Sequence, residues 1–195
     1  YIAKTFSFNL LSSGKIYRYL AFKIIQNKYK YDKRSIKKIA KSITLKKLNK
    51  TKIYQPNVTK LASSIAKKKY VRNYLKKFQI DFIKQNNKVI IEGRDIASKI
   101  MPNADLKLFF KCSLNEKAKR RLKEFKKLNS SMNLKEVKKA LKLRDFHDKN
   151  RKESPLLFTK GAVLVDTTNL NLNQMNLKLK KLVQKEILKK KHGSL

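Results

Sequence analysis

Arginine and acidic residues occur close together in the sequence at two places, in patterns suited to binding a phosphate. The first is Glu92-Gly93-Arg94-Asp95, directly after a short apolar run. The Arg94 guanidinium can hold a phosphate through two parallel hydrogen bonds, while the two carboxylates can accept from sugar hydroxyls, a base amine or a neighbouring arginine. Gly93 lets another backbone approach closely. A surface turn with an ion pair is the competing interpretation.

The second place is the segment 144–151, which contains Arg144, Asp145, Asp148 and Arg151. On a helix, spacings of three and four bring side chains onto one face. Paired Arg and Asp side chains there can orient each other and close onto a bound phosphate. The same pattern is typical of a salt-bridged, solvent-exposed helix face.

Two weaker segments add hydroxyl groups and cations. Ser12-Ser13-Gly14-Lys15 follows a weak strand pattern and leads into a helical one. Small residues at such a junction suit contact with a phosphate, but the G-x-x-x-x-G-K-[ST] spacing of a phosphate-binding loop is absent. Arg120-Arg121, on a predicted helix, is by itself no different from surface charge.

Short apolar runs and helical patterns alternate along the chain, and these elements must position the segments above. Buried parallel strands are predicted at 89–91, 106–112, 162–165 and, more weakly, at 8–11. Apolar residues at helical spacing cover 58–82, with a joint near 67–69. Capping patterns predict helix starts at 113–116, 133–136 and 171–174. The alternation predicts an α/β fold with a mainly parallel sheet, which binds ligands at the carboxyl ends of its strands.

Two regions differ from this pattern. Residues 26–57 are rich in Lys, weakly periodic and contain Pro56, which favours a small inserted helical subdomain. Residues 119–152 mix Lys, Arg and Asp densely, as either a helical flap over a cleft or an ordinary solvated helix pair would. The opening residues 1–6 are typical of the last turns of a helix.

Charge dominates the composition of the 195-residue chain, which has 51 Lys and Arg against 13 Asp and Glu and a formal net charge of +38. The 41% of hydrophobic residues are enough for a folded core. No run of about 18 apolar residues is present, so no membrane-spanning helix is predicted. Only eight of the basic residues are Arg. The evenly spread Lys residues are interpreted as surface composition, whereas each Arg marks a place where a bidentate guanidinium matters.

Several segments in order resemble the cytidylate kinases, a family of nucleoside monophosphate kinases. KVIIEGRD at 88–95 and RR at 120–121 are similar to one block of that family, and LRDFHDKNRKESPL at 143–156 is similar to its lid segment. LLSSGKIYR and VTKLASSIAKKKYVRNYL resemble its monophosphate-binding segments, and GAVLVDTTNL resembles its last strand. The resemblance covers nearly the whole chain and is weakest over 26–57. Seven of the eight Arg residues lie on these segments; only Arg34 does not.

The resemblance implies a role for each matching residue. The residues implied to bind the nucleoside monophosphate are Ser13, Arg18, Ser63, Arg72, Arg94, Asp95, Asp148 and Arg151. Among them, Ser63 is implied on the cytosine side and Asp148 at the ribose. Lid or ATP-side arginines are Arg120, Arg121 and Arg144, and the catalytic cations are Arg94, Arg144 and Arg151. No metal-ligating cluster is implied.

The implied fold is a three-layer α/β fold of the P-loop nucleoside monophosphate kinase type. Its core kinase domain covers 1–25 and 86–195, with a monophosphate-binding helical subdomain at 26–85 and a lid at 119–152 within the core. The implied reaction transfers a phosphoryl group from ATP, with Mg²⁺, to CMP or dCMP. A cytoplasmic monomer in pyrimidine metabolism, without specific nucleic acid or membrane partners, is implied as well.

The chain departs from the family at its start. The resemblance places a phosphate-binding loop and the first, central strand of the sheet before residue 1, and neither occurs among the 195 residues. We therefore expect an N-terminally truncated sequence of a full kinase, which as it stands is catalytically crippled.

Two other functions compete with a CMP kinase. The net charge of +38, with eight Tyr and ten Phe residues for stacking on bases, favours a basic RNA-binding or ribosome-associated protein. No recognisable RNA-binding motif supports it. A kinase for another monophosphate, UMP or AMP, differs only in a few contacts to the base edge, which the sequence alone does not place.

Overall fold

Four short strands form two parallel pairs. Strand β1 (Asn9–Ser12) pairs with β2 (Val89–Glu92), and β3 (Lys107–Lys111) pairs with β4 (Ala162–Asp166). Their register aligns Ser12 with Glu92 and Lys111 with Asp166, so the carboxyl ends of each pair lie level. All four predicted strands and their parallel pairing are confirmed.

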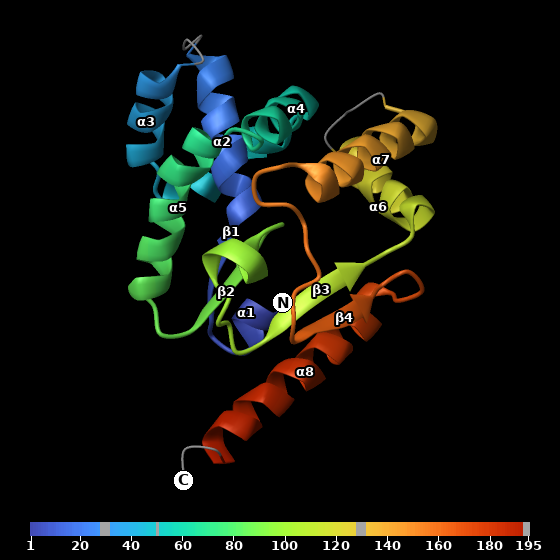
Figure 1. Ribbon diagram of the computed structural model, residues 1–195. Coiled ribbons are helices and arrows are strands. Elements are labelled where there is room, and N and C mark those ends of the chain that lie inside the picture. Colours follow the sequence, from blue (N-terminus) through green and yellow to red (C-terminus); the bar gives the residue numbers. More distant parts are fainter. Residues whose placement is uncertain (28–31, 50, 128–131, 193–195) are drawn as a thin grey trace. The chain divides into compact units, whose positions relative to one another are not determined.

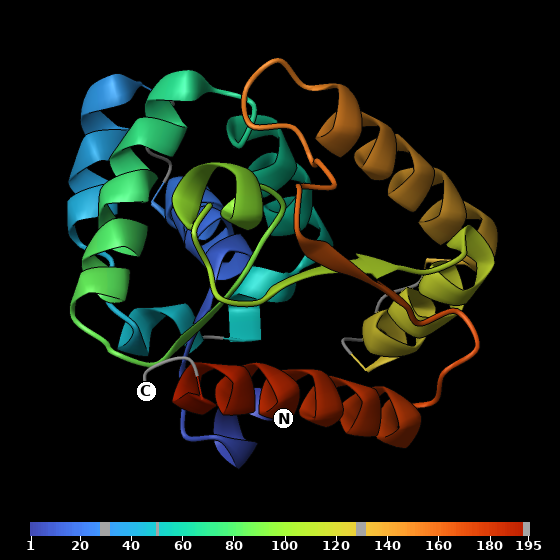
Figure 2. The same ribbon diagram turned by 60° about the horizontal axis from the view of Figure 1, so that its bottom comes forward.

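The computed structural model describes residues 1–27, 32–49, 51–127 and 132–192, and it divides into two compact units (Figures 1 and 2). The β1–β2 unit comprises Asn9–Ile96 and Asn150–Pro155. The β3–β4 unit comprises Tyr1–Phe8, Ala97–Lys149 and Leu156–Leu195. These bounds differ from the expected domains, which separate 1–25 from 26–85, because the helix that follows β1 shares its core with the helices of 26–85.

The helices of the β1–β2 unit enclose one apolar core. They are α2 (Ser13–Gln26), α3 (Lys33–Lys41), α4 (Pro56–Ile65) and α5 (Lys69–Lys84), with 3₁₀ turns η1 (Lys46–Asn49) and η2 (Thr51–Tyr54). Ile16 and Leu20 of α2 are fully buried in this core, together with Val58 of α4 and Leu75 of α5. This confirms the helical nature of the inserted region and the break between two helices near 67–69.

Polar caps start the helices of the β3–β4 unit where the sequence predicts them. The helices of the unit are α1 (Ile2–Thr5), the π-helical turn η3 (Ile96–Ile100), α6 (Leu114–Lys126), α7 (Leu134–Asn150) and α8 (Leu172–His192). The first residue of η3, Ile96, and the last residue of α7, Asn150, belong to the β1–β2 unit. The Ser113 side chain accepts a hydrogen bond from the Glu116 N–H at 3.3 Å. Reciprocal caps join Asn133 to Glu136, and Asn171 to Gln174, over 2.8–3.0 Å. These caps satisfy N–H groups that have no partner within the helix.

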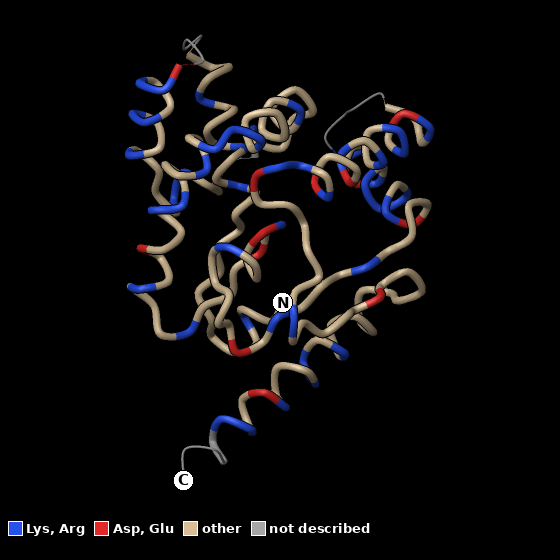
Figure 3. The backbone as a smooth tube through the Cα atoms, viewed as in Figure 1, with Lys and Arg blue, Asp and Glu red and all other residues tan. Residues whose placement is uncertain are grey.

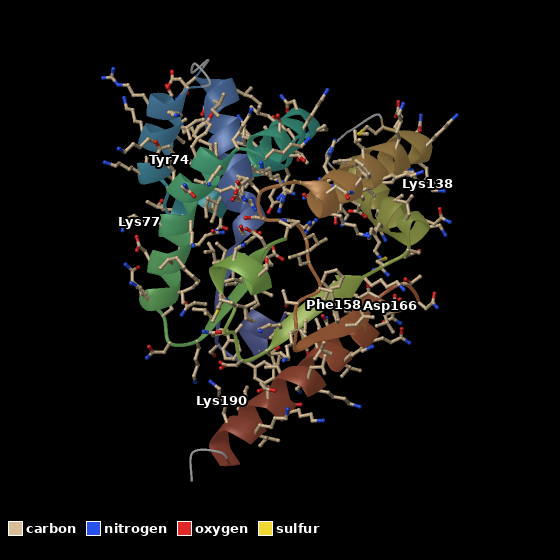
Figure 4. All side chains as sticks on the ribbon, viewed as in Figure 1. Tyr74, Lys77, Lys138, Phe158, Asp166 and Lys190 are labelled. Carbon is tan, nitrogen blue, oxygen red and sulfur yellow. The ribbon has the colours of Figure 1, made fainter. Side chains whose placement is uncertain are left out.

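Strand burial is the main difference from prediction. The apolar runs were expected to be buried on both faces, yet the exposed fractions are 53% for Leu10, 51% for Phe110 and 49% for Leu164. Burial on both faces is typical of wider parallel sheets covered by helices, whereas each sheet here has only two strands. Phe158 packs edge-on against Phe109 of β3 with ring centroids 5.4 Å apart, and still remains exposed (Figure 4).

Lys and Arg residues are distributed over the helices of both units (Figure 3). Over the described ranges, no helix combines the length and the apolar character needed to cross a bilayer.

Candidate active site

The carboxyl ends of β1 and β2 bring two of the predicted segments together. Because Ser12 and Glu92 are paired, the start of α2 and the turn at 93–95 are neighbours. A Cβ atom added at Gly93 would lie 2.8 Å from Cγ1 of Ile96 and 3.0 Å from Cβ of Ser13. The turn therefore packs directly on the start of α2, and glycine at 93 makes this approach possible.

A buried ion pair joins this turn to α5. Arg72 Nη2 lies 2.9 Å from Asp95 Oδ2, and the two side chains are 9% and 8% exposed. Arg72 Nη1 also donates to the Tyr17 hydroxyl at 3.2 Å and to the Ala66 carbonyl at 3.3 Å. Arg72 is thus held in one orientation by groups from α2, from the end of α4 and from the β2 turn.

A second buried polar contact joins α5 to α2. Gln79 Nε2 donates to Ser13 Oγ at 2.6 Å, and the two residues are 2% and 3% exposed. The acceptor-side cluster is defined here as Ser13, Tyr17, Arg72, Gln79 and Asp95. Two of them, Tyr17 and Gln79, were not predicted from the sequence. Gln79 had a detectable signal, because it interrupts the apolar face of α5 two turns after Arg72.

Arg151 affects this cluster electrostatically. Burial raises the pKa of the Tyr17 hydroxyl above its ordinary value of 10.0, the positive charges of Arg72 and Arg151 oppose that rise, and the negative charge of Asp95 adds to it. The prediction that Arg151 shares a helix face with Arg144 and Asp148 is wrong, because α7 ends at Asn150. The chain turns there, and Arg151 Nε donates to the Ser154 carbonyl at 2.6 Å.

The remaining acceptor-side predictions lie around the same helices. Arg18 of α2 places its guanidinium carbon 5.3 Å from the centre of the Tyr54 ring. Ser63 is partly buried on α4, and within the described part of the chain no hydrogen bond links its side chain to the cluster. Arg94 is exposed beside Asp95.

The α6–α7 helix pair carries the other predicted residues. Arg144 Nε lies 3.7 Å from the carboxylate of Asp148, which is only 6% exposed. Lys117 of α6 pairs with Asp145 of α7 at 2.6 Å. The segment is helical up to Asn150, and the Arg144–Asp148 pair is the expected contact between an Arg and an Asp of this segment. Its role as a lid stays a prediction.

Arg120 and Arg121 make contacts within the fold. Arg120 donates from Nε to Glu116 at 3.0 Å, and from Nη2 to the carbonyls of Thr167 at 2.8 Å and Leu170 at 3.1 Å. This joins α6 to the turn that follows β4. Arg121 pairs with Glu124 and places its guanidinium carbon 4.3 Å from the centre of the Phe125 ring. Their predicted contact with ATP remains a prediction.

Comparison with known proteins decides the family. The family model described as cytidylate kinase matches residues 1–185. A cytidylate kinase of Fusobacterium nucleatum is 36% identical over 185 residues, covering 89% of this chain and 84% of the relative. One from Rickettsia africae is 37% identical over 171 residues, covering 87% and 77%. This chain belongs to the cytidylate kinase family.

Cytidylate kinase membership confirms the resemblance found in the motifs, and with it the P-loop nucleoside monophosphate kinase fold class. The roles of individual residues stay predictions that the variants below address. In the described ranges, no three His, Cys, Asp or Glu side chains gather as ligands for a metal ion.

Tyr17 offers a test of the buried environment in this cytidylate kinase. Since its pKa is raised in the folded state, its contribution to stability is fully present below about pH 10 and is lost as the pH rises through the folded-state pKa. The difference in unfolding free energy between wild type and Tyr17→Phe should therefore be constant below pH 10 and change only above it. Ultraviolet absorption of tyrosinate, compared between the two proteins, should place the Tyr17 transition above 10. A Tyr17 transition at or below 10 would contradict the buried environment.

Proposed function

We propose that this protein is a phosphotransferase that moves the terminal phosphoryl group of ATP to CMP, with dCMP as a second acceptor, giving ADP and CDP or dCDP. The reaction belongs to pyrimidine nucleotide metabolism in the cytoplasm. Mg²⁺ enters with ATP as part of the co-substrate, because Mg²⁺ in such sites keeps several waters and is bound through substrate phosphates rather than by a cage of protein ligands.

The observation that carries the proposal is an unsatisfied hydrogen-bond donor on the Arg72 side chain. Its Nε–H is buried and donates to no atom of the described residues, although both terminal nitrogens are engaged. A buried donor without an acceptor costs about 1–3 kcal/mol. A phosphate oxygen of the acceptor would satisfy this donor, which supports a role for Arg72 in holding an anion while Asp95 fixes the plane of its guanidinium.

The neighbouring groups fit the rest of a nucleotide. The Ser13 hydroxyl, held by Gln79, can donate or accept a hydrogen bond at a sugar or a base edge, and the Asp95 carboxylate can accept one there. Arg151 and Arg94 supply further cations for the phosphate. Residues 119–152, with Arg144, are proposed as the lid that excludes water from the reaction.

These residues match the needs of phosphoryl transfer. No protein nucleophile is required; the reaction depends on in-line positioning and on cations around the transferring group. Fixed guanidinium groups stabilise the charge of the transition state without reorganising during the step. The proposed roles of the chain's residues are therefore to bind, orient and neutralise.

The direct test couples ADP production to CMP, dCMP, UMP and AMP in turn, with the natural full-length protein. We expect turnover with CMP and dCMP well above that with UMP and AMP. A folded protein without CMP-dependent turnover would refute the proposal, and faster turnover with UMP or AMP would assign another acceptor. Tight, salt-tolerant, sequence-specific RNA binding would favour the RNA-binding alternative, because binding by net charge alone collapses with salt.

Arg151→Lys tests the phosphate role of Arg151. The variant keeps the positive charge but loses the planar guanidinium, which can donate two parallel hydrogen bonds to a phosphate. We therefore expect kcat to fall by roughly tenfold or more, while the thermal unfolding midpoint changes little. Steady-state kinetics with CMP measure the effect. Unchanged kinetics would show that Arg151 does not clamp a phosphate.

A further inference from the structure

A basic groove lies in the β1–β2 unit, and it contains none of the residues of the acceptor-side cluster. It runs between α2, α3 and η1 and has a volume of about 310 Å³. The residues that line it are Tyr19, Lys23, Asn27, Lys38, Ile39, Ser42 and Lys47. Three of these seven side chains are Lys, and none is acidic.

The groove keeps hydrogen-bond donors available. Lys23 Nζ donates to Gln26 Oε1 at 3.1 Å, and Lys47 Nζ donates to the Ser42 carbonyl at 2.7 Å. Because an ammonium group has three protons, each of these Lys residues keeps two for another acceptor. Tyr19 is only 1% exposed, and its hydroxyl makes no hydrogen bond within the described ranges.

We propose that this groove binds a small phosphate monoester. Three ammonium groups without an acidic neighbour among the lining residues match a dianion, for which Lys serves as a point charge. The volume is at the lower end of ordinary small-molecule pockets, about 300–1,000 Å³, and so leaves room for more than a bare ion. The Asn27 amide, the Ser42 hydroxyl and the apolar Ile39 would contact the organic part of the ester.

This site is independent of the proposed CMP kinase activity. Lys23 and Tyr19 lie on α2, the helix that also carries Ser13 and Tyr17, but they line the groove toward α3. The two regions can be observed separately, because Ile39 lines the groove and Ile96 lies against Gly93 at the acceptor-side cluster.

The test follows Ile methyl resonances by NMR in the natural full-length protein while glycerol phosphate, inorganic phosphate or glycerol is added. Glycerol phosphate should shift the Ile39 methyl resonance saturably, and glycerol should not. The triple variant Lys23→Gln, Lys38→Gln, Lys47→Gln should bind at least about tenfold more weakly, because it loses three charge-assisted contacts. Tyr19→Phe, which removes one hydroxyl from an unchanged fold, should weaken binding several-fold.

A matched control separates a built site from net charge. The variant Lys60→Gln, Lys76→Gln, Lys84→Gln removes the same charge from exposed positions of α4 and α5 in the same unit. It should leave the affinity within about twofold of wild type. Equal weakening by both triple variants, or shifts at Ile96 without any at Ile39, would overturn the proposal. Inorganic phosphate binding as tightly as glycerol phosphate would overturn the monoester assignment.

Discussion

Arg72→Lys should lower kcat/KM for CMP about a hundredfold, which corresponds to roughly 2.7 kcal/mol of transition-state stabilisation. The side chain contacts Asp95 from Nη2 and both Tyr17 and the Ala66 carbonyl from Nη1, over 2.9–3.3 Å. A lysine carries the same charge on one nitrogen, so it cannot reach these partners and a phosphate together. Steady-state kinetics with CMP and ATP measure the change.

Arg34→Lys is the matched control for this substitution. Arg34 is exposed on α3 and is the one arginine outside the family motifs, so its replacement should leave kcat/KM within about twofold. Urea unfolding of both variants separates a loss of activity from a loss of structure. A folded Arg72→Lys protein with wild-type kcat/KM would remove Arg72 from the proposed phosphate site.

Asp95→Ala should destabilise the protein by about 3–5 kcal/mol, because it leaves the guanidinium of Arg72 buried without its carboxylate. This is a large part of the 5–15 kcal/mol typical of a folded domain. Asp95→Asn keeps an acceptor for Arg72 and should cost less. Urea denaturation of wild type and both variants gives the unfolding free energies.

Two controls make the Asp95 prediction specific. Asp81→Ala breaks a pair with Lys77 at 3.1 Å, whose lysine is 82% exposed and points into solvent (Figure 4), and it should cost less than about 1 kcal/mol. Adding Arg72→Met to Asp95→Ala removes the unpaired charge, so the double variant should be more stable than the sum of the single effects predicts. Simple additivity would mean that the two side chains do not interact in solution.

The elements of the fold were largely predictable because their signals are local. The capping sequences at 113–116, 133–136 and 171–174 start helices because side chain and backbone groups three residues apart satisfy each other. Short apolar runs became parallel strands at the expected places. Strand burial was mispredicted, since the exposure of Leu10 or Leu164 depends on how many strands and helices surround it.

The candidate site was only partly predictable. Ser13, Arg72 and Asp95 were found through motifs, but the contacts within the acceptor-side cluster join positions 23 to 66 residues apart in the chain. Nothing local to Gln79 shows that its amide meets the Ser13 hydroxyl, 66 residues away. Arg151 was placed on a helix by its spacing, while the structure ends that helix one residue earlier.

Family membership, helix starts and strand positions could therefore be predicted from the amino-acid sequence alone, because each rests on motifs or on contacts between residues a few positions apart. The pairing of Arg72 with Asp95, the raised pKa of Tyr17 and the basic groove lined by Tyr19 were decided only by the tertiary structure. Burial and the approach of distant helices create these features, and neither quantity is a property of a short stretch of sequence.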